Sequence, residues 1–367
     1  MAALANGALR IPSPPASADS VGTEAGWRAW EFWPTWATYA PLVPWIAWLA
    51  LRHGGAGTVA AANPAFADGG LVGESKFDIL RMLPPQWAIP SARIESGPLE
   101  TRRRAIAGFL ELAGVAWPLV LKPDVGQRGA GVRKVASAAE ATDYLRGAEY
   151  PIVAQPWHPG PFEAGVFYWR HPAEGRGRIF SITDKIFPRI VGDGASTFET
   201  LVRAHPRLSR QWPVFKARHA ASLGRVLAPG EVFLLGEVGN HCQGTLFRDG
   251  WALWTPALEA RIDTIAREVP GFFIGRFDVR YSNRERFMAG EELAILELNG
   301  VTAEPTDVYD PERTVWSSYR ALFEQWRQVF TIGAANRRLG HPGASWRRLL
   351  RLGLQHLRDS RRFPVSS

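Results

Sequence analysis

The sequence predicts a mixed protein, α/β to α+β, in which a small α/β N-terminal domain precedes two β-rich subdomains. Three observations predict this class. The chain has 367 residues, more than one compact core usually holds. Its 46% apolar and 21% charged residues are typical of a globular protein. From about residue 117 to residue 299, strand-like apolar runs alternate with helical patterns, and no internal repeat is visible.

We expect four segments along the chain. Residues 1–25, rich in Ala, Pro and Ser, form a disordered lead-in, which lacks the basic and apolar regions of a signal peptide. Residues 26–115 form an N-terminal region, residues 116–335 the main domain, and residues 336–367 a basic amphipathic helix and tail. Because Cys242 is the only cysteine, no internal disulfide is possible and a reducing, cytoplasmic location is expected.

The N-terminal region contains a Trp-rich, uncharged segment at 32–51. Pro34, Pro41 and Pro44 interrupt it and leave too few consecutive residues for a membrane-spanning helix. Two interpretations remain open: a buried helix with aromatic packing, or peripheral contact with a membrane interface, where Trp is favoured. After it we expect a strand at 58–62, a glycine-rich turn, a helix from about Glu74 that Pro84 ends, and a helix at 99–113.

The main domain begins where the pattern changes to strands. We expect strands at 117–122, 131–135, 152–155, 163–170, 177–187, 231–236, 244–254, 272–281 and 293–299. Helices are expected at 138–146, 197–204, 256–268 and 311–335, and Ser196 is the predicted N-cap of the second.

A glycine-rich loop joins the first two of these strands. Gly126, Gly129 and Gly131 allow positive φ angles and a close approach of backbone N–H groups to phosphate oxygens. Lys122, at the end of the preceding strand, can reach the same phosphates. A plain hairpin turn would use the same glycines, so the loop alone does not decide between the two interpretations.

Two later strands carry a more specific pattern. Alternation places Arg276, Asp278 and Arg280 on one face of the first strand, and Glu297 and Asn299 on one face of the second. If these strands pair antiparallel across 282–292, two carboxylates and an amide oxygen converge, which is a donor set suited to Mg²⁺. The alternative is a solvated strand face with paired charges, but apolar flanking residues make uncompensated carboxylates costly there.

A third element, Asp184-Lys185-Ile-Phe-Pro-Arg189 with the following Val-Gly-Asp-Gly turn, ends another apolar strand. Lys185 is a second candidate phosphate ligand beside Lys122, although a lysine at a strand end is often only solvated.

Together, LKPDVGQRGAGV, ITDKIFPRIVGDGASTFETLV and GRFDVRY…ILELNG resemble the ATP-grasp superfamily, in the branch of D-alanine–D-alanine ligases and other carboxylate–amine ligases. The resemblance covers about residues 73–309 and implies the ATP-grasp fold over 116–335, with two subdomains that clamp ATP. It implies ATP and Mg²⁺ (or Mn²⁺) as cofactors, and small-molecule carboxylate and amine substrates.

The resemblance also implies roles for individual residues. Lys122 and Lys185 would contact the ATP phosphates, Gly126 to Gly131 would cover them, and Lys76 would reach the nucleotide from an upstream helix. Asp278, Glu297 and Asn299 would hold one or two metal ions. Arg276 would stabilise the acyl phosphate or tetrahedral intermediate, and Arg189 would lie near the substrate carboxylate or phosphates.

The adenine side departs from the family pattern. The hinge 153–157 carries Gln155 and Pro156 where many relatives have an acid, and Pro156 has no N–H to donate. Adenine contacts are therefore expected from Gln155 and from the backbone around Ala154 and Trp157. Glu163 is similar to the family's ribose-binding glutamate.

The implied reaction is ADP-forming ligation: the carboxylate attacks the γ-phosphate, and an amine then displaces phosphate from the acyl phosphate. An ATP-grasp phosphotransferase and a non-catalytic nucleotide-binding, membrane-associated protein are the alternatives. The sequence shows no Ser/His/Asp arrangement and gives no case for Cys242 as a nucleophile. Asn240 and His241 either face the substrate pocket or belong to an ordinary polar turn.

The basic charge is concentrated at the C-terminus. From Arg337 onward there are eight arginines and one acidic residue, so this stretch carries +7 of the net charge of +8. The body is near neutral, which argues against nucleic-acid binding. On a helix, Trp346, Leu350 and Leu354 share one face with Leu349, Gly353 and Leu357. Two interpretations remain open. The helix packs on the body, or segments 346–362 and 32–51 both contact the anionic inner face of a membrane.

Overall fold

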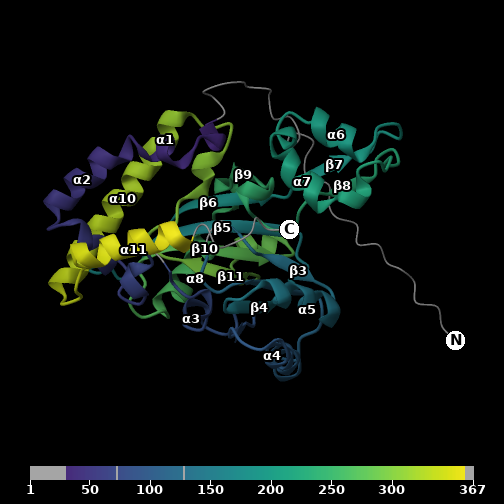
Figure 1. The fold of residues 1–367 in the computed structure, drawn as a ribbon. Helices are drawn as coiled ribbons and strands as arrows, with labels where there is room; N and C mark the ends of the chain where they lie inside the picture. Colours follow the sequence, from purple (N-terminus) through teal and green to yellow (C-terminus); the bar gives the residue numbers. More distant parts are fainter. Residues whose placement is uncertain (1–29, 72, 127–128, 360–367) are drawn as a thin grey trace.

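The structure is a computed structural model, and it describes residues 30–71, 73–126 and 129–359. The strands form sheets of five, four and two strands, all with antiparallel pairing (Figure 1). The predicted mixed class with two large β-rich units is therefore confirmed. The predicted disordered lead-in at 1–25 lies outside the described residues.

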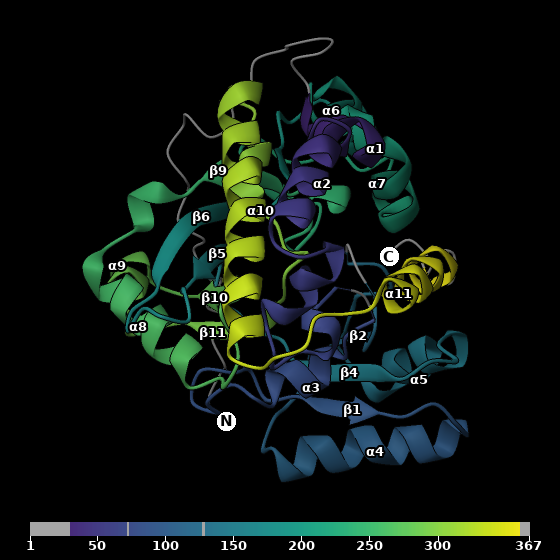
Figure 2. The same ribbon diagram turned by 90° about the vertical axis from the view of Figure 1, so that its left-hand side faces the viewer.

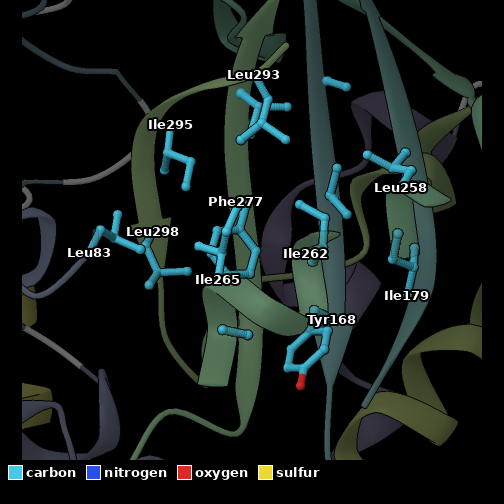
Figure 3. Close-up of a cluster of buried hydrophobic side chains, with 14 of the residues drawn as sticks. Leu83, Tyr168, Ile179, Leu258, Ile262, Ile265, Phe277, Leu293, Ile295 and Leu298 are labelled. Carbon is cyan, nitrogen blue, oxygen red and sulfur yellow. The ribbon is translucent and has the colours of Figure 1, made fainter. Parts of the chain in front are cut away.

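The five-stranded sheet has the strand order β11-β10-β5-β6-β9. Its members are β5 (Phe162–Trp169), β6 (Arg178–Ile186), β9 (Leu246–Asp249), β10 (Ile274–Tyr281) and β11 (Ala294–Asn299). Helix α8 (Pro256–Arg267) covers one face, and Ile262 and Ile265 pack there against Phe277 and Tyr168 (Figure 3). Because strand side chains alternate between faces, Arg276 and Asp278, which flank Phe277, point away from this core.

The four-stranded sheet has the order β1-β4-β2-β3, formed by β1 (Ala92–Ile94), β2 (Leu119–Pro123), β3 (Arg133–Val135) and β4 (Ile152–Pro156). Helices α4 (Leu99–Leu112) and α5 (Ala138–Gly147) cover one face, where Leu121 and Ala154 are buried (Figure 2). Alternation therefore places Lys122 and Gln155, the next residues along β2 and β4, on the opposite face. That face lies toward the larger sheet, since both side chains donate to the carbonyl of Leu296 on β11.

A third unit follows β6. It consists of β7 (Arg189–Val191), α6 (Phe198–Ala204), η6 (Leu208–Gln211), α7 (Trp212–Arg218), η7 (Ala220–Ser222) and β8 (Val232–Leu234), around a core of its own. The predicted helix at 197–204 is confirmed, but Ser196 as its N-cap is wrong. Thr197 caps α6 by accepting from the Thr200 N–H, because the Ser196 hydroxyl is bonded to Asp193 in the preceding turn.

Between Trp30 and Leu80 the described residues form helices and turns. These are η3 (Trp30–Phe32), α1 (Thr35–Tyr39), α2 (Leu42–Arg52), η4 (Ala56–Ala61), η5 (Ala67–Gly69) and α3 (Lys76–Leu80). The strand predicted at 58–62, as part of a small N-terminal α/β domain, is wrong: the segment is the 3₁₀ helix η4. It packs against the long helix α10 (Val315–Arg338), where a Cβ on Gly333 would lie 2.2 Å from the Thr58 carbonyl oxygen. Small residues allow this close helix contact, which leaves no place for a partner strand.

The remaining elements are η8 (His241–Gln243), η9 (Trp251–Leu253), α9 (Arg284–Met288), η10 (Thr306–Tyr309) and α11 (Trp346–Asp359). Helix α2 packs on α10 through Leu42 and Leu49, which are both buried. The prediction of a buried helix within 32–51 is therefore confirmed for the side of α2 that faces α10. No helix among the described residues has the length and apolar character that crossing a membrane requires.

Asn63 joins the N-terminal segment to β10. Its side chain is fully buried, accepts from the N–H groups of Phe273 and Ile274, and donates to the Ile274 carbonyl at 2.7 Å. We expect Asn63→Ala to lower the free energy of unfolding by about 3 kcal/mol, because it leaves buried backbone groups without partners. Urea denaturation of the whole chain measures this. Asn283→Ala, which removes only the exposed N-cap of α9, should cost about 1 kcal/mol; equal losses would contradict this account of Asn63.

Candidate active site

The site is built on the hairpin of β10 and β11. The two strands pair antiparallel, as predicted, and Asp278 lies opposite Glu297 while Arg276 lies opposite Asn299. The Asn299 side-chain amide donates to the Asp278 carboxylate at 3.1 Å. The pairing therefore brings the predicted carboxylates and amide to one face of the hairpin.

Asp278 is the centre of this arrangement. The Nε and Nη2 atoms of Arg276 donate to the two carboxylate oxygens of Asp278, at 3.0 and 3.1 Å. The Lys185 ammonium donates to the same carboxylate at 2.8 Å. Burial alone would raise the pKa of Asp278, but the charges of Arg276 and Lys185 hold it well below its usual value. The carboxylate is therefore ionised at every physiological pH.

Glu163 on β5 extends the charged network. It is buried, and it accepts from Lys185 at 2.9 Å and from Arg280 at 3.0 Å. Burial would raise its pKa, but these two cations lower it. Gly239 lies against it so closely that a Cβ would be 1.9 Å from a Glu163 oxygen, so a larger residue there would have to displace the carboxylate from its ion pairs. Arg280 had been placed on the same strand face as Arg276 and Asp278, but its role as the second partner of Glu163 was missed.

Lys122 reaches this hairpin from the other sheet. Its ammonium donates to the Leu296 carbonyl at 3.2 Å and lies 4.0 Å from the Glu297 carboxylate. Burial lowers its pKa, against the opposing effect of Glu297. The structure therefore brings Lys122 and Lys185, from different sheets, to one charged cluster.

Lys76 on α3 joins the cluster as well. Its ammonium donates to the Gly126 carbonyl and lies 3.7 Å from Glu297. The Glu297 carboxylate is thus flanked by Lys76 and Lys122, neither closer than 3.7 Å. It is also partly exposed. This leaves its oxygens accessible to another ligand.

Glu74, two residues before Lys76, is a member that sequence reasoning missed. Its Oε2 atom is buried without a hydrogen-bond partner, although the backbone of Gly300 bonds to the side chain. Burial raises the pKa of this carboxyl to about 7, and the Glu297 charge adds to the effect. Its position within the GESK stretch beside Lys76 was the only signal in the sequence.

The raised pKa of Glu74 has a consequence for stability. The ordinary pKa of this carboxyl is 4.5, so the folded state binds its proton more tightly than the unfolded chain does, and stability falls as pH rises from 4.5 to about 7. Without nucleotide, Glu74→Gln should increase the free energy of unfolding at pH 8 by roughly 2 kcal/mol and flatten this pH dependence. Urea denaturation across pH measures both. Glu95→Gln, at an exposed glutamate, should change neither; an identical profile for Glu74→Gln and the parent chain would contradict the assignment.

The glycine-rich loop adopts the backbone that the sequence predicts at two positions. Gly129 and Gly131 have φ angles of +67° and +71°, which favour glycine. A Cβ on Gly129 would lie 2.2 Å from the Asn240 side-chain nitrogen, so the turn at Asn240 lies against this loop. His241 instead bonds to buried Glu31 at 2.8 Å and packs beside Phe247, in agreement with an ordinary structural histidine.

The hinge residues predicted to contact adenine are already engaged. The Gln155 amide donates to Ser91 and to Leu296, and the Trp157 N–H donates to the Pro118 carbonyl. The Trp157 ring carries Lys134 at 4.0 Å and Arg280 at 4.5 Å from its centroid. How adenine is held stays a prediction for these residues.

Arg189 lies on β7, in the two-stranded sheet, opposite Leu234. It is thus in the third unit, beyond the end of the strand that carries Lys185. Its predicted role beside the substrate stays a prediction.

The charges of the cluster indicate what it can hold. Cations outnumber carboxylates in the cluster by five to four: Lys76, Lys122, Lys185, Arg276 and Arg280 stand against Glu74, Glu163, Asp278 and Glu297. An excess of buried or half-buried positive charge is suited to a polyphosphate.

The donor set is also compatible with Mg²⁺. Across the described residues, no three His, Cys, Asp or Glu side chains assemble into a complete metal site. Mg²⁺ commonly uses one or two carboxylates together with substrate phosphates. Glu297, with its accessible oxygens, and Asp278 with Asn299 fit that pattern. The site thus combines an excess of positive charge with carboxylate and amide oxygens, an arrangement suited to a polyphosphate together with a divalent cation.

No protein-family model matches the sequence, and no curated protein does. Among solved structures, the chain is similar to a bifunctional glutathione synthetase from Pasteurella multocida (14% identity, TM-score 0.36, covering 68% of this chain and 36% of that one). It is also similar to VanG D-Ala:D-Ser ligase from Enterococcus faecalis (13%, 0.38, 71% and 61%). A third is a carboxyaminoimidazole ribonucleotide synthase from Aspergillus clavatus, complexed with ATP (15%, 0.35, 61% and 44%).

The chain thus spans between 36% and 61% of the length of these three proteins. Their names are those of a synthetase, a ligase and a synthase. With TM-scores this low, the similarities do not carry the functional conclusion, which rests on the side chains described above.

Proposed function

We propose that this chain is an ATP- and Mg²⁺-dependent ligase that activates a carboxylate as an acyl phosphate for attack by an amine. One observation carries the proposal: two buried lysines from different sheets, Lys122 and Lys185, meet at the hairpin that carries Asp278, Glu297 and Asn299. The ATP-grasp resemblance of the motifs that contain these residues supports it.

In this mechanism the lysines bind phosphate oxygens of ATP and align the γ-phosphate with the carboxylate. Asp278 acts by position, because it holds Arg276 and Lys185 through three hydrogen bonds. The Arg276 fork offers two donors to the negative charge that develops during transfer and during attack by the amine. Asp278, Glu297 and Asn299 would hold Mg²⁺. A bound Mg²⁺ would neutralise part of the negative charge of the phosphates.

An assay with hydroxylamine tests the proposal. The chain is incubated with ATP, Mg²⁺ and pools of amino acids or other small carboxylates, and hydroxamate formation is measured together with ADP. A ligase that makes an acyl phosphate yields a hydroxamate, because hydroxylamine intercepts it. Formation of ADP with a stable phosphorylated product and no hydroxamate would favour the phosphotransferase. No ADP with any pool would favour the non-catalytic nucleotide-binding protein.

A further inference from the structure

Helix α2 is apolar on both sides. Its inner side packs on α10 through Leu42 and Leu49. Its outer side carries Pro44, Ala47, Trp48 and Leu51, which are all exposed and follow one another at helical spacing. Trp48 is 48% exposed and Leu51 85% exposed. A helix that is apolar all round is ordinarily buried on all sides. The outer stripe, defined as Pro44, Ala47, Trp48 and Leu51, is instead left uncovered by the described residues.

A pocket of basic residues lies at the end of this stripe. It has a volume of about 370 Å³ and is lined by Arg52 and His53 at the end of α2 and by Ala334, Arg337 and Arg338 at the end of α10. Among the described residues, no carboxylate lies within ion-pair distance of any of the three arginines. Arg337 is anchored by donating to the Gly54 carbonyl and the Thr58 hydroxyl. The pocket is therefore a positive site for which the described residues supply no carboxylate counter-ion.

Helix α11 adds a second half-covered apolar surface. Leu352 is buried against the body, whereas Trp346, Leu350 and Leu354 remain exposed, spaced four residues apart. The segment that leads into α11 is attached to η4, because the Ala344 N–H donates to the Gly57 carbonyl. In Figure 1, α2 lies at the left edge of the molecule, with α10 between it and the five-stranded sheet.

We infer that the outer stripe of α2 and the adjoining arginine pocket form a docking surface for an anionic phospholipid membrane. Exposed tryptophan and leucine next to uncompensated arginines match the interface of such a membrane, where apolar side chains enter the acyl boundary and cations meet phosphate groups. A symmetric contact with a second copy fits less well, because a twofold contact at the pocket would bring its arginines together. The surface is separate from the proposed catalytic cluster.

Co-sedimentation of the whole chain with vesicles tests this inference. We expect binding to phosphatidylcholine vesicles that contain phosphatidylglycerol, little binding to phosphatidylcholine alone, and weaker binding in high salt. Arg338→Glu should weaken binding about fivefold or more, from the contribution of one cation at an anionic surface. Leu51→Glu should weaken it roughly tenfold, because a charge replaces the most exposed apolar side chain of the stripe.

Matched controls lie on α4, the helix that covers the four-stranded sheet. Leu112→Glu changes an equally exposed leucine (91%), and Arg104→Glu an exposed arginine (80%); both should bind vesicles like the parent chain. Circular dichroism of each variant verifies folding. Equal binding to both vesicle types, equal loss in the α4 controls, or no vesicle binding would overturn the inference. So would concentration-dependent dimerisation that Leu51→Glu abolishes, since the stripe would then be a contact between copies.

Discussion

Asp278→Asn should reduce ATP-dependent ADP formation by about 10³-fold or more. The substitution keeps the shape of the side chain but removes the negative charge that faces Arg276, Lys185 and Asn299. A neutral amide cannot hold both cations in their present geometry, and it brings no negative charge to a bound Mg²⁺. The variant loses both the fixed charge that positions Arg276 and Lys185 and a metal ligand. The expected loss of rate is therefore at or above the range usual for removing one electrostatic group.

The matched control for this variant is Asp263→Asn. Asp263 is also mostly buried and accepts from the Tyr168 hydroxyl and the Gly177 N–H, but on the α8 side of the sheet. We expect this variant to lose stability and to retain the turnover of its folded fraction. Turnover that falls equally in both variants, or Asp278→Asn that keeps parental turnover, would remove Asp278 from the site.

Arg276→Lys should reduce kcat by about 10²- to 10³-fold and leave the KM for ATP nearly unchanged. The positive charge is kept, but the two-pronged donation to Asp278 and the donation to the Glu304 carbonyl are lost. If Arg276 acts on charge that develops during transfer, the loss appears in kcat rather than in ground-state binding. Steady-state kinetics with the substrates found by the hydroxamate screen measure both constants.

Arg284→Lys provides the comparison, because Arg284 bonds to Asp184 at 2.8 Å outside the charged cluster. It should leave both constants within a few-fold of the parent values. A rise in KM with unchanged kcat for Arg276→Lys would assign Arg276 to substrate binding instead of to the chemical steps.

Much of the fold follows from local pattern. Continuous apolar runs and clear alternation predict the pairing of β10 with β11, and with it the meeting of Asp278, Glu297 and Asn299. The sequence fails where tertiary contact decides. Residues 58–62 have strand-like composition but form η4, because Gly333 and Gly57 allow close packing against their neighbours.

The parts of the site that escaped prediction depend on distant pairing. Arg280 matters because β5 brings Glu163 beside β10, and that register cannot be read from either strand alone. Glu74 lies on an irregular segment whose burial arises only when it packs beside Gly300 and Glu297. Periodicity carries no information about such a residue, although its neighbour Lys76 could be identified from the resemblance.

The most direct test of the proposed nucleotide site is calorimetric titration of ATP into the chain, with and without Mg²⁺, for the parent and Glu297→Gln. Glu297 is the partly exposed carboxylate between Lys76 and Lys122. We predict that the parent binds ATP more tightly when Mg²⁺ is present, and that Glu297→Gln loses this dependence on Mg²⁺ while remaining folded. Absence of ATP binding by the parent, or the same dependence on Mg²⁺ in both proteins, would contradict the account.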